Sequence, residues 1–136
     1  PRLRIRAQDG FAAIAERADG TLDLIVRDAF ADAEVPHQLR SREWWEHARR
    51  VLRPGGFVVA NTAVTPASDA AGADARAAST VFDELLAIGE HATLKRKRRG
   101  NAILVAGTLA MAEVTEPLQR YAASAALPTS VVRDWL

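Results

Sequence analysis

Three polar residues stand where a chemically active site could form, because each follows a stretch that is typical of a β-strand. They are Asp9, Asp28 and Asn61. In an open sheet of parallel strands, ligands bind beyond the carboxyl ends of the strands. A carboxylate in that position can attract a protonated amine and accept a proton from it. We therefore predict that the three side chains share one rim of the sheet, with Asp28 at the end of an interior strand and facing an open cleft.

A simpler interpretation of these aspartates stays open. Aspartate often ends a strand because its side chain caps the turn that follows, and Asp9-Gly10 is also a common turn dipeptide. For any single aspartate, turn chemistry is the favoured explanation. Three polar strand ends in one chain favour ligand binding for the set.

The elements that must position these residues are predicted from hydrophobic spacing. Leu3, Ile5 and Ala7 alternate with polar residues, which is typical of a strand with one wet face. Residues 24–26 are apolar on both faces, as in a parallel sheet covered by helices. The complete prediction is strands over 3–10, 22–29 and 56–63, helices over 10–20, 41–52 and about 76–88, a flexible loop over 64–75, two strands within 91–109 around a turn at 99–101, a helix from Thr115, and the start of another helix over 129–136.

This order of elements predicts a layered α/β domain. Strands that alternate with helices favour βαβ units and parallel pairing. The two strands near the carboxyl terminus predict an antiparallel end to the sheet. The expected fold is therefore a three-layer α/β sheet, mostly parallel, with an antiparallel C-terminal hairpin. A chain of 136 residues suits one domain, which we place over residues 1–136.

The composition excludes several classes of protein. A formal net charge of +1 argues against a dedicated nucleic-acid-binding protein. The chain has no cysteine, which excludes disulfides and thiolate metal sites, and its three histidines show no metal-binding spacing. No apolar run approaches the roughly 20 residues of a membrane helix, and no signal pattern opens the chain. We therefore predict a cytoplasmic protein that binds no metal, no nucleic acid and no membrane.

Two conspicuous clusters are better explained by structure than by function. Lys95 to Arg99 are five consecutive basic residues that could contact phosphate. They abut a turn and no aromatic residue is interleaved with them, which favours a solvated hairpin tip that protects a sheet edge. Trp44 and Trp45 could form a stacking surface. Their helical spacing instead predicts that one packs a helix on the sheet and that the other is half exposed.

Three parts of the chain resemble a known family. They are RIRAQDGFAAI (4–14), LDLIVRDAFADAEVPHQLRSREWWEHARRVLRPGGFVVANTA (22–63) and the two-strand unit near the carboxyl terminus. In this order they resemble the second half of the spermidine-synthase-like branch of the Rossmann-fold, S-adenosylmethionine-type transferases. DG after one strand, DAF after the next and LRPGG before the third carry the resemblance, which covers about residues 1–110. Each motif is common by itself, and the ordered set is more specific.

The resemblance implies a Rossmann-like, methyltransferase-type fold and a role for each residue of the site. Asp9 would accept a hydrogen bond from the adenine amino group of the cofactor, and Gly10 would let the backbone pass close to the base. Asp28 would lie beside the sulfonium and take a proton from the acceptor amine, and Ala29 would leave room beside it. The implied cofactor is S-adenosylmethionine or its decarboxylated form, and the implied acceptor is a small-molecule amine.

Two departures from the family pattern leave the function open. The family loop D-S-S-D-P-x-G-P-A is replaced by DAFADAEVPHQL, which places the second acid, Asp32, one position later. No G-x-G-x-G occurs, and the family's glycine-rich unit would precede Pro1. The first hypothesis is a spermidine-synthase-like transferase of polyamine biosynthesis, with S-adenosylmethionine-dependent methyl transfer as the alternative. The second is a non-catalytic α/β module or fragment that pairs with another chain.

The departures also predict how the chain behaves by itself. Without the glycine-rich unit it should bind either form of the cofactor weakly or not at all, and it should be inactive. Sheet edges that lack a neighbouring strand invite pairing with another chain. We therefore expect a homo-oligomer.

Overall fold

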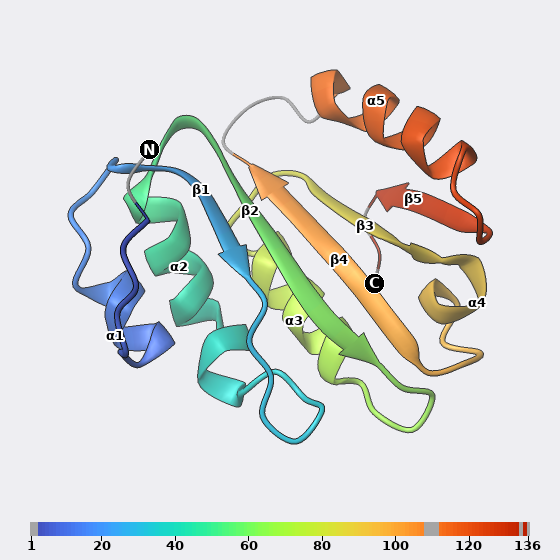
Figure 1. Ribbon diagram of the computed structural model, residues 1–136, viewed down its shortest axis with the longest axis horizontal. Coiled ribbons are helices and arrows are strands. Elements are labelled where there is room, and N and C mark those ends of the chain that lie inside the picture. Colours follow the sequence, from blue (N-terminus) through green and yellow to red (C-terminus); the bar gives the residue numbers. More distant parts are fainter. Residues whose placement is uncertain (1–2, 108–111, 134, 136) are drawn as a thin grey trace.

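The computed structural model describes residues 3–107, 112–133 and 135, and these residues form one sheet surrounded by helices (Figure 1). None of the described helices is long and apolar enough to cross a membrane. The elements in chain order are α1 (Gly10–Ala15), β1 (Leu22–Arg27), the 3₁₀ helix η1 (His37–Arg40), α2 (Arg42–Val51), β2 (Leu52–Val64), α3 (Ala70–Ser79), β3 (Leu85–Glu90), α4 (His91–Leu94), β4 (Gly100–Gly107), α5 (Ala112–Ala123) and β5 (Thr129–Arg133).

The described strands form a mixed sheet in the order β1-β2-β4-β3-β5. β1 pairs with β2 in parallel, β4 runs antiparallel between β2 and β3, and β5 is antiparallel to β3. β1, β2 and β3 therefore point in one direction, so their carboxyl ends lie toward one rim of the sheet. The predicted α/β class with antiparallel strands at its C-terminal end is confirmed.

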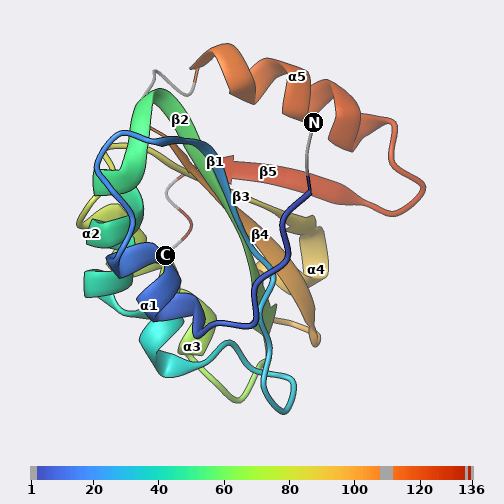
Figure 2. The same cartoon turned by 60° about the vertical axis from the view of Figure 1, so that its left-hand side comes forward.

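The sheet is covered unequally on its two faces. Helices α1, α2 and α3 pack on one face, and α5 lies on the opposite side, near β5 (Figure 2). On that second face Leu118 of α5 packs against Leu86 and Val105. The same face of β1 is open, because Leu24 and Val26 are 54% and 64% exposed.

Helix α2 forms as its sequence predicts and packs on the sheet. Ser41 caps its first turn, with Oγ accepting a 3.2 Å hydrogen bond from the backbone N–H of Trp44. Both Trp44 and Trp45 are buried, so the prediction of one half-exposed tryptophan is wrong. The reason is that α2 is enclosed on two sides: Trp44 faces β1, and the Trp45 ring meets Phe82 edge-on at a centroid distance of 6.1 Å.

The strand predicted over residues 3–10 does not form. Residues 3–9 contain no strand, and Leu3 and Ile5 are 87% and 86% exposed. An alternating sequence becomes a strand only where a neighbour accepts its backbone hydrogen bonds, and no described strand lies beside this segment. β1 is therefore an edge strand of the described sheet, which corrects the prediction that Asp28 ends an interior strand.

Several boundaries between residues 64 and 94 differ from the prediction. α3 begins inside the predicted loop, because alanine favours helix and its small side chain lets Ala71, Ala75 and Ala78 pack tightly in the core. β3 begins inside the predicted helix, since a short apolar run does not distinguish a buried strand from a buried helix. α4 then occupies residues where a strand was expected.

The carboxyl-terminal residues also form a different element from the one predicted. A helix was expected over 129–136, and β5 forms instead over 129–133, because Thr129, Val131 and Val132 are β-branched and the edge of β3 is open to pairing; residues 134 and 136 lie outside the described residues. The predicted antiparallel pair is present, although its strands are β3 and β4. Helix α5 was predicted from Thr115 and begins three residues earlier, at Ala112.

Candidate functional site

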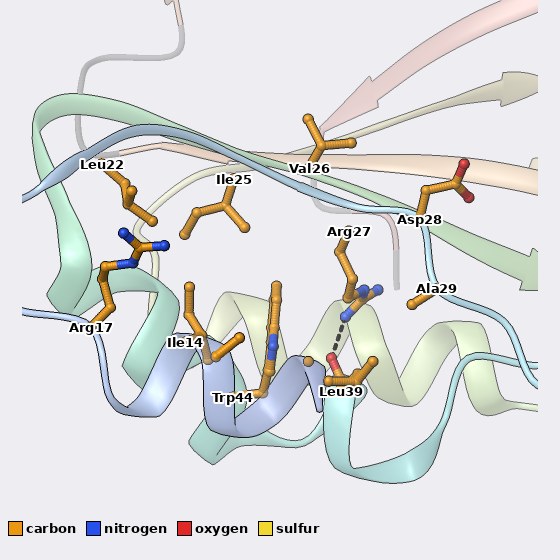
Figure 3. A pocket seen from close by; sticks show the side chains of 12 residues that line it. Ile14, Arg17, Leu22, Ile25, Val26, Arg27, Asp28, Ala29, Leu39 and Trp44 are labelled. Carbon is orange, nitrogen blue, oxygen red and sulfur yellow. Dashed lines mark hydrogen bonds between the residues drawn. The ribbon is translucent and has the colours of Figure 1, made fainter. Parts of the chain in front are cut away.

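A pocket of about 270 Å³ lies between β1 and the helices that cover it (Figure 3). Its walls are largely apolar, with Ile14 from α1, Leu39 from η1 and Trp44 from α2. Arg17 stands at one end of the pocket, beside Leu22. The shape and lining suit a flat, mostly apolar group with polar atoms at its edge.

Three of the four predicted cofactor-binding residues line this pocket. Gly10 comes from the start of α1, and Asp28 and Ala29 come from the end of β1. The fourth, Asp9, precedes Gly10 and caps α1, since its Oδ1 accepts a 2.9 Å hydrogen bond from the N–H of Ala12. This is the turn chemistry that the sequence left open for Asp9. Its Oδ2 takes no hydrogen bond from the described residues.

Asp28 and Asn61 are joined across the parallel strand pair. Asn61 Nδ2 donates a 3.0 Å hydrogen bond to Asp28 Oδ1, because the register of β1 on β2 places the two residues side by side. Asp28 and Asn61 therefore lie together as predicted, although β2 continues past Asn61 to Val64, whereas Asp9 follows no strand and caps α1. Figure 3 shows that the side chains of Asp28 and Val26 point away from the helices, whereas Arg27 and Ala29 point toward them.

Two oxygen atoms of this pair have no hydrogen-bond partner among the described residues, and one of them is exposed. Asp28 is exposed, and its Oδ2 receives no hydrogen bond from the described part of the chain. Asn61 Oδ1 is buried and likewise has no hydrogen-bond partner there. A buried polar atom without a partner is uncommon in a folded protein. Of the two oxygens, the exposed Asp28 Oδ2 is the one that a cationic hydrogen-bond donor could reach.

A buried ion pair underlies the pocket, and the sequence prediction did not include it. Arg27 Nη1 donates to Asp74 Oδ1 at 3.1 Å and to the Leu39 carbonyl at 2.6 Å, and Nη2 donates to Asp74 Oδ2. Trp45 Nε1 donates to Asp74 Oδ1 at 3.0 Å. The sequence places each partner beside apolar residues, since Arg27 follows Leu24-Ile25-Val26 and Asp74 lies among alanines. Charged residues on such faces are almost never buried unless they are paired.

Asp32, the candidate second acid, lies in a tight turn. Its φ of 50° and that of Ala33, 71°, are both in the left-handed region. The turn is closed by backbone hydrogen bonds of 2.8 and 3.0 Å between Ala31 and Glu34. Asp32 therefore sits at an exposed tip and does not line the pocket.

The basic run from Lys95 to Arg99 follows α4, and part of its charge is neutralised within the chain. Arg96 is ion-paired with Asp69, and Arg98 Nη1 lies 2.8 Å from Glu90 Oε1. The Arg76 and Arg96 guanidinium groups hold the pKa of the Asp69 carboxyl below its ordinary value. The run leads into β4, which is an interior strand of the described sheet, so the expected role of protecting a sheet edge does not apply.

The described residues contain no group of three His, Asp or Glu side chains that could hold a metal ion. His37, which lies in the segment after Asp28, does not line the pocket at β1. It lines a separate depression with Phe11 and Glu43.

Known proteins that match this chain in sequence or in structure include a polyamine aminopropyltransferase and spermidine synthases. The sequence match to the first covers less than half of this chain, and one structural match extends over almost all of it. No family model matches the chain. A 56-residue stretch is 36% identical to a polyamine aminopropyltransferase of Prochlorococcus marinus (strain MIT 9313), and it covers 41% of this chain and 20% of that protein. The structure matches that of a probable spermidine synthase from Corynebacterium glutamicum ATCC 13032 with a TM-score of 0.83 and 27% identity, over 96% of this chain and 50% of that one.

Two further structures share the fold at lower identity. A spermidine synthase in complex with the transition state analogue AdoDATO matches with a TM-score of 0.63 and 20% identity, over 80% of this chain and 37% of that one. The spermidine synthase from Thermotoga maritima gives 0.60 and 19%, over 80% and 36%. The chain thus spans half or less of the length of each of these four proteins.

Proposed function

Because the chain resembles the spermidine-synthase-like branch of the S-adenosylmethionine-type transferases in its motifs and its fold, we propose that it forms part of an aminopropyltransferase of that kind. The proposed reaction moves an aminopropyl group from decarboxylated S-adenosylmethionine to a small-molecule amine, as in polyamine biosynthesis. The observation that carries the proposal is the Asp28 carboxylate, oriented by Asn61 at the rim of the pocket.

The pocket fits one part of such a cofactor, the base. Ligand pockets commonly measure about 300–1,000 Å³, so a volume of about 270 Å³ suits a single flat group. Asp9 stands next to Gly10 at this pocket with a free carboxylate oxygen, which an adenine amino group could use as its acceptor. Ala29, with its small side chain, leaves room on the opposite wall. The remainder of the cofactor extends beyond these residues, so we expect the chain alone to bind it weakly.

Asp28 is the proposed general base. When bound, the cofactor supplies a carbon atom activated by an adjacent sulfonium. Asp28 attracts the protonated acceptor amine and accepts one of its protons at Oδ2, which frees the nitrogen lone pair. That lone pair forms the new N–C bond, and the electrons of the broken C–S bond go to sulfur. Before the proton transfer the carboxylate holds the ammonium in place by its charge, and afterwards the protonated Asp28 stays beside the nitrogen as a neutral acid.

Asn61 is the proposed orienting group for this carboxylate. Its Nδ2 fixes Asp28 Oδ1 and leaves Oδ2 free for the proton transfer. Its own Oδ1 is buried, so the exposed Asp28 Oδ2 is the acceptor proposed for an ammonium N–H. A hydrogen bond between a carboxylate and an ammonium is charge-assisted, which favours a protonated amine over a neutral hydroxyl.

Methyl transfer from S-adenosylmethionine is a second candidate, because the turn at Asp32 removes an argument for a diamine acceptor and therefore for aminopropyl transfer in particular. Recognition of a diamine in the resembled family involves a second acid in the loop after Asp28. Here Asp32 lies at the tip of a closed turn, away from the pocket lining. An acceptor with a single amine needs one carboxylate, and both methyl and aminopropyl transfer can use Asp28 in the same way.

We also propose that β1 pairs with a further strand in the assembled protein. β1 has no neighbour on its outer edge among the described strands, and its apolar side chains Leu24 and Val26 are exposed beside that edge. Unpaired strand edges with apolar faces promote association. A second copy of the chain is the proposed partner when the chain is isolated.

The proposal is tested by assaying the complete natural protein with decarboxylated S-adenosylmethionine and a set of diamines. A new aminopropylated product would support it. Turnover only with S-adenosylmethionine would support the methyl-transfer candidate, and no turnover with either cofactor would refute both.

A further inference from the structure

The ion pair between Arg27 and Asp74 is almost completely removed from water. The two side chains are 3% and 0% exposed. Burial strips both charges of their hydration, and their attraction often fails to compensate for that loss. Arg27 Nε is in addition buried without a hydrogen-bond partner among the described residues. Stability alone is therefore a poor explanation for a charged pair at this place.

The pair connects four separate elements at one point. Arg27 belongs to β1 and Asp74 to α3. Arg27 Nη1 reaches the Leu39 carbonyl in η1 at 2.6 Å, and Asp74 Oδ1 accepts from Trp45 Nε1 of α2 at 3.0 Å. The Arg27 guanidinium also lies 5.2 Å from the centre of the Trp45 ring. These directional contacts fix the end of β1 relative to both helices and to the loop that follows the strand.

Two residues that the ion pair holds in place belong to the site: Asp28, which follows Arg27, and Leu39, whose carbonyl Arg27 binds. Arg27 precedes Asp28 directly, and residues next to each other in a strand point to opposite faces. Anchoring Arg27 on the helix side therefore holds Asp28 on the other side, where Asn61 meets it. Leu39 is itself a wall of the pocket, and its carbonyl is held by the same guanidinium.

We propose that Arg27 and Asp74 are positioning residues, which set the direction of Asp28 and the width of the pocket between β1 and η1. The consequence for turnover rests on the proposed function of Asp28. The other part of the proposal, that the ion pair orders residues 28–40, does not depend on any ligand.

A double variant separates positioning from folding. Arg27→Met combined with Asp74→Leu removes both buried charges and keeps apolar side chains of similar size, a change that is often neutral or stabilising for the fold. The control is Arg42→Gln with Glu46→Gln, which removes an exposed ion pair of α2 that touches neither the pocket nor β1. Amide hydrogen exchange is measured in the free chain, with the amides of β2 as an internal reference.

We expect the double variant to unfold at a denaturant concentration close to that of the wild type, while amides within residues 28–40 exchange at least about tenfold faster. In the complete natural protein, kcat should fall by about 10²-fold, the scale of a misplaced catalytic group. Arg27→Lys keeps the positive charge and one donor nitrogen. Its amide exchange over residues 28–40 and its kcat should therefore lie between those of the wild type and those of the double variant.

Unchanged exchange over residues 28–40 in a folded double variant would overturn the proposal. If the double variant does not fold, Arg27→Lys provides the test of the proposal. Lysine has one donor nitrogen where arginine uses two, and its positive charge still pairs with Asp74. Exchange in that variant equal to the wild-type value would also overturn it. Failure of the wild-type protein to catalyse either transfer would refute the proposed function alone, since the exchange experiment uses no cofactor.

Discussion

Asn61 on β2 donates a 3.0 Å hydrogen bond to Asp28 at the end of β1, which joins two residues 33 positions apart in the sequence. The bond occupies one carboxylate oxygen and leaves the other open. It thereby gives the exposed carboxylate a fixed direction, which a general base requires in order to meet its substrate.

Removal of Asn61 should lower turnover without unfolding the protein. In Asn61→Ala, Asp28 keeps its charge but loses its only described donor, so kcat of the complete protein should fall by about tenfold or more. Asn101→Ala, on the adjacent strand β4 and exposed, is the control and should leave kcat unchanged. Equal losses in both variants would argue against an orienting role for Asn61.

Disruption of one half of the buried ion pair should strongly destabilise the chain. Asp74→Asn keeps the size of the side chain and an acceptor for Trp45, but it leaves the Arg27 charge uncompensated in the core. The free energy of unfolding in urea should drop by about 3–5 kcal/mol. Glu46→Gln breaks an exposed pair and should cost about 1 kcal/mol or less. Similar values for the two variants would contradict the importance of burial.

The cluster of Asp69 with Arg76 and Arg96 should make stability depend on pH in the acid range. The two guanidinium groups lower the pKa of Asp69 in the folded chain, so the folded state binds a proton there less readily than the unfolded state. The resulting stabilisation is present above the unfolded carboxyl pKa of about 3.9 and is lost as the pH falls through the lower folded value. Asp69→Asn should reduce the loss of stability between about pH 5 and pH 2, measured by urea unfolding. An unchanged acid profile would show that the cluster does not contribute.

Self-association of the isolated chain should depend on the open face of β1. We expect light scattering to give a dimer or larger species for the wild type, and Val26→Lys to shift it toward the monomer because charge on an edge strand opposes pairing. Tyr121→Lys alters a residue that is 75% exposed on α5 and serves as the control. A wild-type chain that stays monomeric at high concentration would contradict the prediction.

The sequence predicted local features well where one residue type has one dominant physical role. Ser41 as a helix cap, the apolar strand that ends before Asp28, and the closeness of Asp28 and Asn61 all follow from such roles. The resemblance to spermidine-synthase-like proteins, which rested on ordered motifs around these residues, is confirmed by the comparisons.

Features that depend on distant partners were missed. Arg27 and Asp74 are 47 positions apart, and no local pattern in the sequence links one residue to the other. Leu3 and Ile5 alternate as a strand would, yet a strand needs a neighbour that the local sequence does not specify. Leu85 and Leu86 are both buried, so their periodicity suited a helix as well as the strand that they form.

The central claim is that the Asp28 carboxylate acts in the reaction and does not merely end a strand. The most direct test is steady-state kinetics of the complete natural protein with its own acceptor, comparing the wild type with Asp28→Asn and Asp32→Asn. Asp28→Asn is nearly isosteric at an exposed position, so the fold should persist while turnover falls by about 10²-fold or more. Asp32→Asn, at the tip of its turn, should lower turnover much less. Wild-type turnover in Asp28→Asn would contradict the account and leave Asp28 as a residue that only shapes the end of β1.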